Sequence, residues 1–217
     1  MIYDRRDASV TTAIPSELPT ATLDDAELFY TSGITPALSP TLADTTEALL
    51  TAARRAGTTT AFDLNYRSKL WSTDAAGAAY RSLFPHIDVL VAAERDVNAC
   101  LDREGDAIEV ANGLLHEFEF ETVILTRGAH GSVAVQRGDA YEQDAYTADT
   151  FDPVGSGDAF VGGYFARRLQ GGDVADALAY GAATASLKRT IDGDLAVVTP
   201  EEVRALVTAD GDGGISR

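Results

Sequence analysis

Short apolar runs alternate along the chain with longer segments in which apolar residues recur every three or four positions. The short runs have the length of buried strands, and the longer segments have the period of amphipathic helices. The pattern predicts strands over residues 28–34, 60–64, 89–92, 122–126, 132–136 and 140–148, a strand or hairpin fragment over 1–14, and strand-like alternation over 146–151. It predicts helices over residues 42–56, 74–83, 94–101, 108–118, 159–169, 174–189 and 200–207.

The order of these elements indicates the fold class. Strands and helices alternate through the first half, which is typical of an α/β protein with a mainly parallel sheet and helices on both faces. Residues 132–136 and 140–148 follow each other closely and predict a hairpin at a sheet edge. A chain of 217 residues can form one such domain. We expect this domain over residues 1–208 and a flexible tail, rich in Gly and Asp, over 209–217.

The charge balance excludes one class of partner. The formal net charge is −17 and the pI is about 4.4, whereas nucleic-acid binding needs a basic surface. Lys69 and Lys188 are the only lysines, against fifteen arginines. An acidic surface so poor in lysine favours a halophilic protein, since concentrated salt screens the repulsion. An acidic protein from ordinary salt is the alternative.

Other classes of site leave little trace in the sequence. No apolar run is long enough to cross a membrane, and no signal peptide is recognisable, so we expect a cytoplasmic protein. The single cysteine, Cys100, excludes an internal disulfide and is expected to be a small core residue. The three histidines lack metal-ligand spacing.

The most informative segment is a glycine-rich turn before the helix predicted at 159–169. Gly155, Ser156, Gly157 and Asp158 follow the strand-like alternation, and glycines there permit a tightly curved backbone. The first amides of a helix are unpaired and attract an oxyanion such as phosphate. Asp158 would place a carboxylate beside that anion, where it could deprotonate an attacking hydroxyl. Alternatively, Ser156 or Asp158 only caps the helix.

Two further segments carry candidate chemistry. Polar residues follow the strand at 60–64, and the Arg67 guanidinium suits a carboxylate or phosphate, although Arg67 and Asp63 could simply pair with each other. Residues 123–132 read as an ordinary hairpin. Small residues at 182–186 would suit a flat adenine pocket, but close helix packing is the favoured interpretation.

Residues 151–164 read FDPVGSGDAFVGGY. This string resembles the C-terminal signature of the PfkB (ribokinase-like) family of carbohydrate kinases, with Ser156 replacing the commoner alanine. The resemblance implies a ribokinase-like three-layer αβα sandwich and the cofactors ATP and Mg²⁺. It also implies that Asp158 is the catalytic base and that the amides of Gly155, Ser156 and Gly157 hold the transferring phosphoryl group.

Residues 63–71 read DLNYRSKLW and residues 32–40 read SGITPALSP. Together they resemble the 2-keto-3-deoxygluconate kinase branch of the family. The resemblance implies that Arg67 contacts the acid sugar and that Ile34 lines its pocket. The opening residues 3–6, YDRR, resemble a segment of that branch whose first tyrosine and arginine touch the sugar, which implies the same for Tyr3 and Arg5.

The nucleotide side is also implied by resemblance. Residues 126–131, TRGAHG, resemble the family's Lys/Thr-x-Gly-x-x-Gly turn along the nucleotide, here Thr126, Gly128 and Gly131, with Arg127 adding positive charge. The family carries an Asn/Ser-x-x-Glu element that organises magnesium through water. Here Ala93 loses the polar group, while Asp96 keeps a carboxylate on a shorter stem.

The resemblance covers residues 3–207, whereas full-length members have a further N-terminal segment with the first strands and much of the lid. We therefore expect an N-terminally shortened domain with a largely absent lid, and its bare sheet edges make a homo-oligomer one expectation. The expected function is ATP-dependent phosphorylation of 2-keto-3-deoxygluconate or a close relative. The alternatives are a fructokinase or another sugar kinase of the family, and a non-catalytic nucleotide-binding remnant.

Overall fold

The computed structural model describes residues 8–211, with side chains up to Ala209. The chain divides into two compact units, the first ending at Leu125 and the second beginning at Thr126. The prediction of a single domain over 1–208 remains a prediction.

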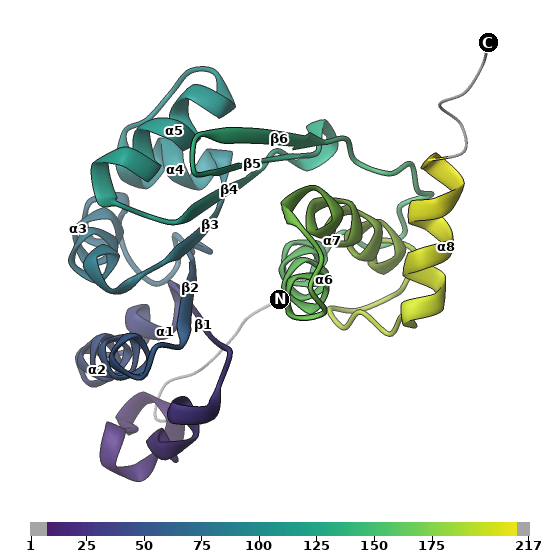
Figure 1. The fold of residues 1–217 in the computed structure, drawn as a ribbon. Helices are drawn as coiled ribbons and strands as arrows, with labels where there is room; N and C mark the ends of the chain where they lie inside the picture. Colours follow the sequence, from purple (N-terminus) through teal and green to yellow (C-terminus); the bar gives the residue numbers. More distant parts are fainter. Residues whose placement is uncertain (1–7, 212–217) are drawn as a thin grey trace. The chain divides into compact units, whose positions relative to one another are not determined.

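Six strands form one sheet in which the strand order follows the chain order (Figure 1). The strands are β1 (Leu28–Ser32), β2 (Thr59–Asp63), β3 (Val89–Ala93), β4 (Thr122–Thr126), β5 (Ser132–Gln136) and β6 (Asp139–Gln143). β1 pairs with β2 and β2 with β3 in parallel, and β5 pairs with β6 antiparallel. The N–H groups of Glu121 and Thr122 donate to the Asp88 carbonyl, so β4 begins beside the start of β3. The predicted mainly parallel sheet with a terminal hairpin is confirmed.

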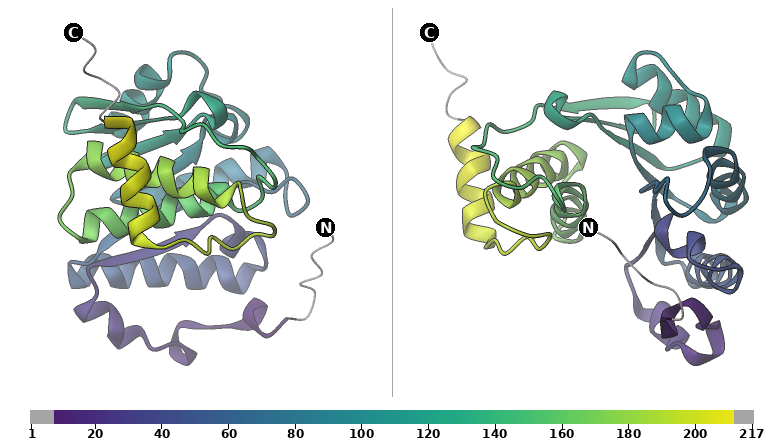
Figure 2. Two further views of the ribbon diagram at one scale, coloured as in Figure 1. Left: turned by 90° about the vertical axis from the view of Figure 1, so that its right-hand side faces the viewer. Right: turned by 180° about the vertical axis from the view of Figure 1, so that it is seen from behind.

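The helices of the first unit connect successive strands. They are α1 (Ile34–Ala37), α2 (Pro40–Ala56), α3 (Thr73–Leu83), α4 (Glu94–Leu101) and α5 (Ala107–Phe118). Helices α2 to α5 lie on the same side of the strands that they connect (Figures 1 and 2). Right-handed crossovers between strands added always in one direction put every connecting helix on one face. The connecting helices of the first unit therefore cover one face of these strands.

Burial of the strands follows their place in the sheet. Four of the five residues of β2 and of β3 are buried, as in parallel strands that read as continuous apolar runs. β1 was expected to be buried as well, but its residues are half-buried and Tyr30 is exposed. The reason is that β1 is the first strand in the sheet order and therefore an edge strand.

Polar side chains cap the first turn of several helices, and aspartate is among these capping residues. Ser39 caps α2 and Ser72 caps α3, each side chain accepting an N–H of the first turn. Asp106 does the same for α5. Such caps satisfy amides that the helix itself leaves unpaired.

The second unit contains the β5–β6 hairpin and three helices, α6 (Ser156–Leu169), α7 (Val174–Lys188) and α8 (Pro200–Gly211). α6 and α7 pack closely, because a Cβ atom on Gly163 would lie 2.4 Å from Thr184 Oγ1. A Cβ on Gly181 would lie 2.9 Å from the Phe160 carbonyl oxygen. Of residues 182–186, Thr184 thus takes part in close helix packing, in agreement with the favoured interpretation.

Several predicted boundaries are wrong. Residues 9–12 form a 3₁₀ helix, not a strand, and two more 3₁₀ turns follow at Pro15–Glu17 and Thr20–Asp25. The strand expected at 140–148 ends at Gln143, and 146–151 forms no strand, because β6 is the last strand of the sheet and pairs with β5. α8 continues to Gly211, so residues 209–211 of the expected tail are helical.

Candidate active site

The glycine-rich turn leads directly into α6. Gly155 is the residue before the helix and adopts a left-handed backbone, with φ 79°. The helix begins at Ser156, three residues earlier than its apolar pattern predicted. Left-handed φ is open to glycine at little cost, and here it reverses the chain so that the helix starts at once. Gly155, Ser156, Gly157 and Asp158 therefore span the N-terminal end of α6, as an oxyanion site requires.

The first turn of α6 offers at least one open donor. Among the described residues, no group accepts a hydrogen bond from the Gly157 N–H. A Cβ atom on Gly157 would find no atom within 4 Å, so no side chain or distant backbone crowds this residue. Ser156 is used locally, because its hydroxyl donates to the Pro153 carbonyl at 2.7 Å. A phosphate oxygen therefore fits the Gly157 N–H and the positive end of the helix dipole.

Asp158 lies in the same first turn of α6 and is exposed. A carboxylate exposed beside an open helix N-terminus is accessible to a substrate hydroxyl, as a general base must be. A carboxylate buried in the core could not act as the base, and Asp158 is not buried.

The segment at the end of α7 and after it holds the turn through hydrogen bonds. The Phe151 and Asp152 N–H groups donate to the Arg189 carbonyl at 2.8 and 3.1 Å. The Asp152 carboxylate accepts the N–H groups of Val154 at 2.9 Å and Gly193 at 3.2 Å. Residues 151–155 are therefore fixed to the segment that follows α7.

Sequence reasoning missed two residues of this support, Asp152 and Lys188. Lys188 is completely buried and donates to the Asp152 carbonyl at 3.1 Å. One signal was present in the sequence: Lys188 is one of two lysines in a chain of 217 residues. Its partner is 36 positions away, so nothing local in the sequence indicated the contact.

The candidate sugar and metal residues of the first unit share one edge of the sheet. Ile34, Arg67 and Asp96 follow β1, β2 and β3, which are adjacent parallel strands, so all three lie at their carboxyl ends. Two hydrogen bonds connect these strand ends. The Gly33 N–H donates to the Asp63 carbonyl at 2.8 Å, and the Tyr66 N–H donates to the carboxylate oxygen Oδ2 of Asp96 at 3.2 Å. This edge is where ligands bind in open α/β sheets.

Arg67 is exposed, and toward the residues that the structure describes its guanidinium donates one long bond, 3.4 Å, to the neighbouring Tyr66 carbonyl. The Asp63 carboxylate, which was considered as its partner, accepts the Asn65 N–H at 3.1 Å. An exposed guanidinium with a weak local contact is available for a bidentate bond to a carboxylate.

Asp96 is almost fully buried, with 6% of its surface exposed. Burial raises its pKa above the ordinary value, although the Tyr66 N–H and the positive charges of Arg95 and Arg67 act in the opposite direction. One carboxylate oxygen accepts the Tyr66 N–H, and the other lies 3.5 Å from Arg95 Nε. No group of three possible metal ligands occurs in the part of the chain that the structure describes. Both carboxylate oxygens of Asp96 thus already have a partner, and its action on Mg²⁺ through water remains a prediction.

The predicted nucleotide turn lies in the second unit and has the required backbone. Gly128 and Gly131 both have positive φ, 60° and 76°, and a Cβ on Gly131 would lie 2.0 Å from the Gln143 carbonyl oxygen. Thr126 ends β4, and the Arg127 N–H donates to the Gly131 carbonyl at 2.8 Å. The Arg127 guanidinium, however, pairs with Glu142 at 3.1 Å, so part of its charge is already compensated.

The predicted site residues thus fall in both units. Ile34, Arg67 and Asp96 belong to the first, whereas Thr126, Arg127, Gly128, Gly131 and Gly155–Asp158 belong to the second. Tyr3 and Arg5 lie outside the described residues, so their contact with the sugar remains a prediction.

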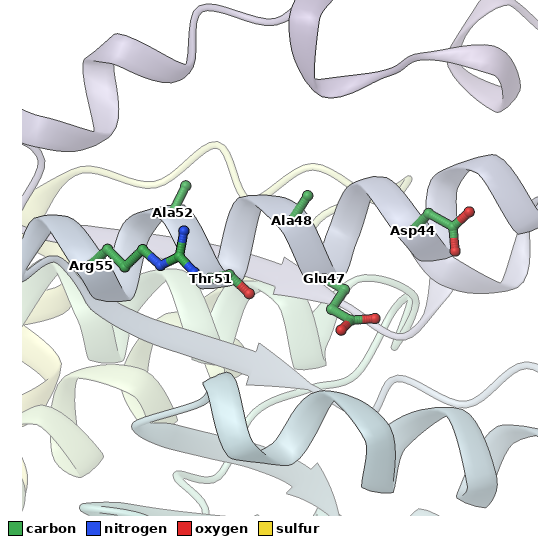
Figure 3. Close-up of a pocket in the computed structure, with 6 residues that line it drawn as sticks. All are labelled: Asp44, Glu47, Ala48, Thr51, Ala52 and Arg55. Atoms are coloured by element: carbon green, nitrogen blue, oxygen red, sulfur yellow. The ribbon is translucent and has the colours of Figure 1, made fainter.

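A pocket of about 400 Å³ lies elsewhere, along the outer face of α2 (Figure 3). It is lined by Asp44, Glu47, Ala48, Thr51, Ala52 and Arg55, all from that one helix. None of them belongs to the predicted site. The pocket is therefore a hollow on the helix surface and adds nothing to the candidate active site.

Two expectations about other chemistry can be compared with the structure. Cys100 is buried in α4, and burial raises the pKa of its thiol to about 11, which confirms a core residue. Within residues 8–211, no helix combines the length and apolarity that crossing a bilayer requires.

Comparison with known proteins defines the class. The model of the pfkB family of carbohydrate kinases matches residues 1–199. Solved structures of this class share the ribokinase-like α/β fold of the chain. The chain therefore belongs to the pfkB family, whose named members are phosphotransferase enzymes.

Three relatives narrow the comparison. A Haloferax volcanii protein named 2-dehydro-3-deoxygalactonokinase is 58% identical over all of this chain, which covers 68% of that protein. The crystal structure of 2-dehydro-3-deoxygluconokinase from Thermotoga maritima is 29% identical, with a TM-score of 0.87. The match covers 95% of this chain and 68% of the Thermotoga chain. An E. coli structure, a putative ribokinase II in complex with ATP and Mg²⁺, matches 96% of this chain and 67% of its own with a TM-score of 0.85 at 22% identity, which shows the fold alone. The chain thus spans about two thirds of the length of these relatives.

Proposed function

We propose that this protein transfers the terminal phosphoryl group of ATP to a hydroxyl of a 2-keto-3-deoxy sugar acid, the galactonate or the gluconate. The names of the Haloferax volcanii and Thermotoga maritima relatives support the sugar-acid class. The observation that carries the proposal is the turn before α6, where the left-handed Gly155, the open Gly157 amide and the exposed Asp158 occur together.

In the proposed reaction, the acceptor hydroxyl oxygen attacks the terminal phosphorus, its proton passes to the Asp158 carboxylate, and ADP leaves. The amides at Gly155–Gly157 are proposed to stabilise the charge on the transferring phosphoryl group, the Gly157 N–H above all, because the Ser156 N–H donates to the Pro153 carbonyl at 3.2 Å. Positioning and electrostatics suffice for such a transfer, so no covalent enzyme intermediate is needed.

Arg67 is the proposed anchor for the sugar acid, because its guanidinium is exposed at the carboxyl end of β2. Both candidate sugar acids carry the same carboxylate, so Arg67 does not distinguish between them. Ile34, in the first turn after β1, is proposed to line the same pocket. A neutral sugar offers no partner for this guanidinium, which makes fructose the less favoured substrate.

ATP and Mg²⁺ are the proposed cofactors, the pair with which the E. coli protein of the same fold forms its complex. Gly128, Gly131 and the α6 N-terminus are the groups of this chain that fit the nucleotide phosphates. Because Asp96 is buried and already bonded, the proposed role of Mg²⁺ is to neutralise phosphate charge, which matters in a protein of net charge −17. That charge also supports work in concentrated salt, where repulsion of the anionic substrates is screened.

The Asp158→Asn variant tests the proposal, with Asp149→Asn as the matched control, since Asp149 is exposed in the same unit. Turnover of ATP with each sugar acid should fall by about 10²–10⁴ in kcat for Asp158→Asn and remain unchanged for the control. A loss below about tenfold, ~1.4 kcal/mol of barrier, contradicts the base role. If the wild-type protein binds ATP but forms no sugar phosphate at any Mg²⁺ concentration, the non-catalytic alternative is correct.

A further inference from the structure

Lys188 is a buried cation that has no anionic partner among residues 8–211. It ends α7, and none of its side chain is exposed. Its Nζ donates to the carbonyl oxygens of Asp152 at 3.1 Å and Ile191 at 3.2 Å. None of the ion pairs between described residues includes Lys188. Burying an ammonium without a carboxylate is costly, so Lys188 must be retained for something that an apolar side chain cannot do.

The two carbonyl groups belong to different segments. Asp152 lies in the turn before α6, and Ile191 lies in the loop after α7. Two carbonyl oxygens that point at the same place repel each other, and a cation between them converts this repulsion into attraction. The Lys188 ammonium therefore acts as a fixed cation that holds the two segments together.

This contact reaches the candidate active site through a short chain of bonds. The Asp152 carboxylate accepts the Val154 N–H at 2.9 Å, and the next residue is Gly155, which directly precedes α6. On the other segment, Gly193 donates to the same carboxylate at 3.2 Å. The position of Asp152 thus determines where Gly155 places the first turn of α6.

We propose that Lys188 is a positioning residue. Its ammonium binds the Asp152 and Ile191 carbonyls and thereby fixes the Gly155–Asp158 turn in the geometry that phosphoryl transfer uses. The catalytic part of this proposal rests on the proposed function, whereas the effect on the turn does not. The competing explanation is that Lys188 only fills space at the end of α7.

Hydrogen exchange separates these two explanations without any assay of activity. Lys188→Met keeps an unbranched side chain that is one heavy atom shorter and removes the charge. Arg204→Met, at an exposed position on α8, is the control for loss of one positive charge. In Lys188→Met, amides of residues 151–155 and 190–194 should exchange at least about tenfold faster than in the wild type. Amides of 160–168, inside α6, should stay within about twofold of the wild type. Unchanged exchange at 151–155 overturns the proposal.

Kinetics then test the catalytic part. Lys188→Met should lower kcat about tenfold or more and change the KM for the sugar acid by less than about twofold, because Lys188 is proposed to position the turn and not to bind sugar. Loss through KM alone overturns this part. If the wild type has no turnover, the proposed function fails, while the exchange result still decides whether Lys188 fixes the turn.

Chemical rescue provides a third measurement. In Lys188→Ala, ammonium ion should restore part of kcat, because it can donate hydrogen bonds to the two carbonyls. Tetramethylammonium has the same charge and no N–H group, and it should not do so at the same ionic strength. Equal effects of the two ions overturn the proposal. If Lys188→Ala does not fold, the exchange experiment on Lys188→Met gives the decision.

Discussion

Gly155 lies against the backbone of Asp194 so closely that a Cβ atom on Gly155 would be 2.3 Å from the Asp194 carbonyl oxygen. The two residues belong to the turn before α6 and to the loop after α7. Gly155 also has φ 79°, a conformation that side chains with a Cβ rarely adopt. Both the space and the backbone angle at this position therefore require glycine.

We predict that Gly155→Ala destabilises the protein by about 2–4 kcal/mol, from backbone strain and from displacement of the Asp194 loop. The free energy of unfolding from denaturant titration measures this loss. The affinity for a non-hydrolysable ATP analogue, measured by isothermal titration calorimetry, should fall at the same time.

Gly157→Ala is the control for stability, since a Cβ at Gly157 meets no atom within 4 Å and the position is helical. Alanine is the better helix former, so this variant should be as stable as the wild type or more stable by up to about 1 kcal/mol. Equal stability of the two alanine variants would contradict the close contact with Asp194.

Arg67→Ala should discriminate between substrates. A charge-assisted bond to a carboxylate contributes about 1.5–3 kcal/mol, so kcat/KM for the sugar acid should fall about 10- to 150-fold. Turnover of a neutral sugar such as fructose should change by less than about threefold. Arg67→Lys should recover only part of the loss, because an ammonium cannot form the bidentate contact. Equal losses on acid and neutral sugars would disprove the anchoring role.

Asp96 should make stability depend on pH in an unusual direction. Burial raises its pKa, so the folded protein binds this proton more tightly than the unfolded chain does. The stability linked to Asp96 is therefore complete below the ordinary pKa of aspartate and is lost as the pH rises through the raised value.

It follows that Asp96→Asn should be more stable than the wild type at pH 7, and that the difference should shrink as the pH falls toward the ordinary pKa of aspartate. The amide oxygen of asparagine can still accept the Tyr66 N–H. Unfolding free energies measured across this pH range at constant high salt give the comparison. A less stable Asp96→Asn protein at pH 7 would show that the ion pair with Arg95 and the positive charge of Arg67 outweigh burial.

Most strands and helices could be predicted from the sequence because they depend on local patterns. The apolar run at Val89–Ala93 and the helical period at Glu94–Leu101 are read from neighbouring residues, and the structure contains both elements. Residues 146–151 show where local patterns stop being sufficient. Their alternation suits a strand, but a strand also needs a partner, and β6 pairs with β5.

The candidate site divides in the same way. By itself, the sequence determined which chemical groups are present: the Gly155–Asp158 turn, the Arg67 guanidinium, and the places of Ile34, Arg67 and Asp96 at or after the ends of predicted strands. These follow from residue types, short spacings and periodicity, which are properties of the chain over a few residues.

Only the tertiary structure decided what surrounds those groups. In the folded chain, Asp96 is buried and accepts the Tyr66 N–H, the charge of Arg127 is paired with that of Glu142, and Lys188 donates to the carbonyl of Asp152. The partners in these contacts are 30, 15 and 36 positions apart. The electrostatic surroundings of a side chain depend on which distant segments pack around it, and this packing is set by the folded core as a whole.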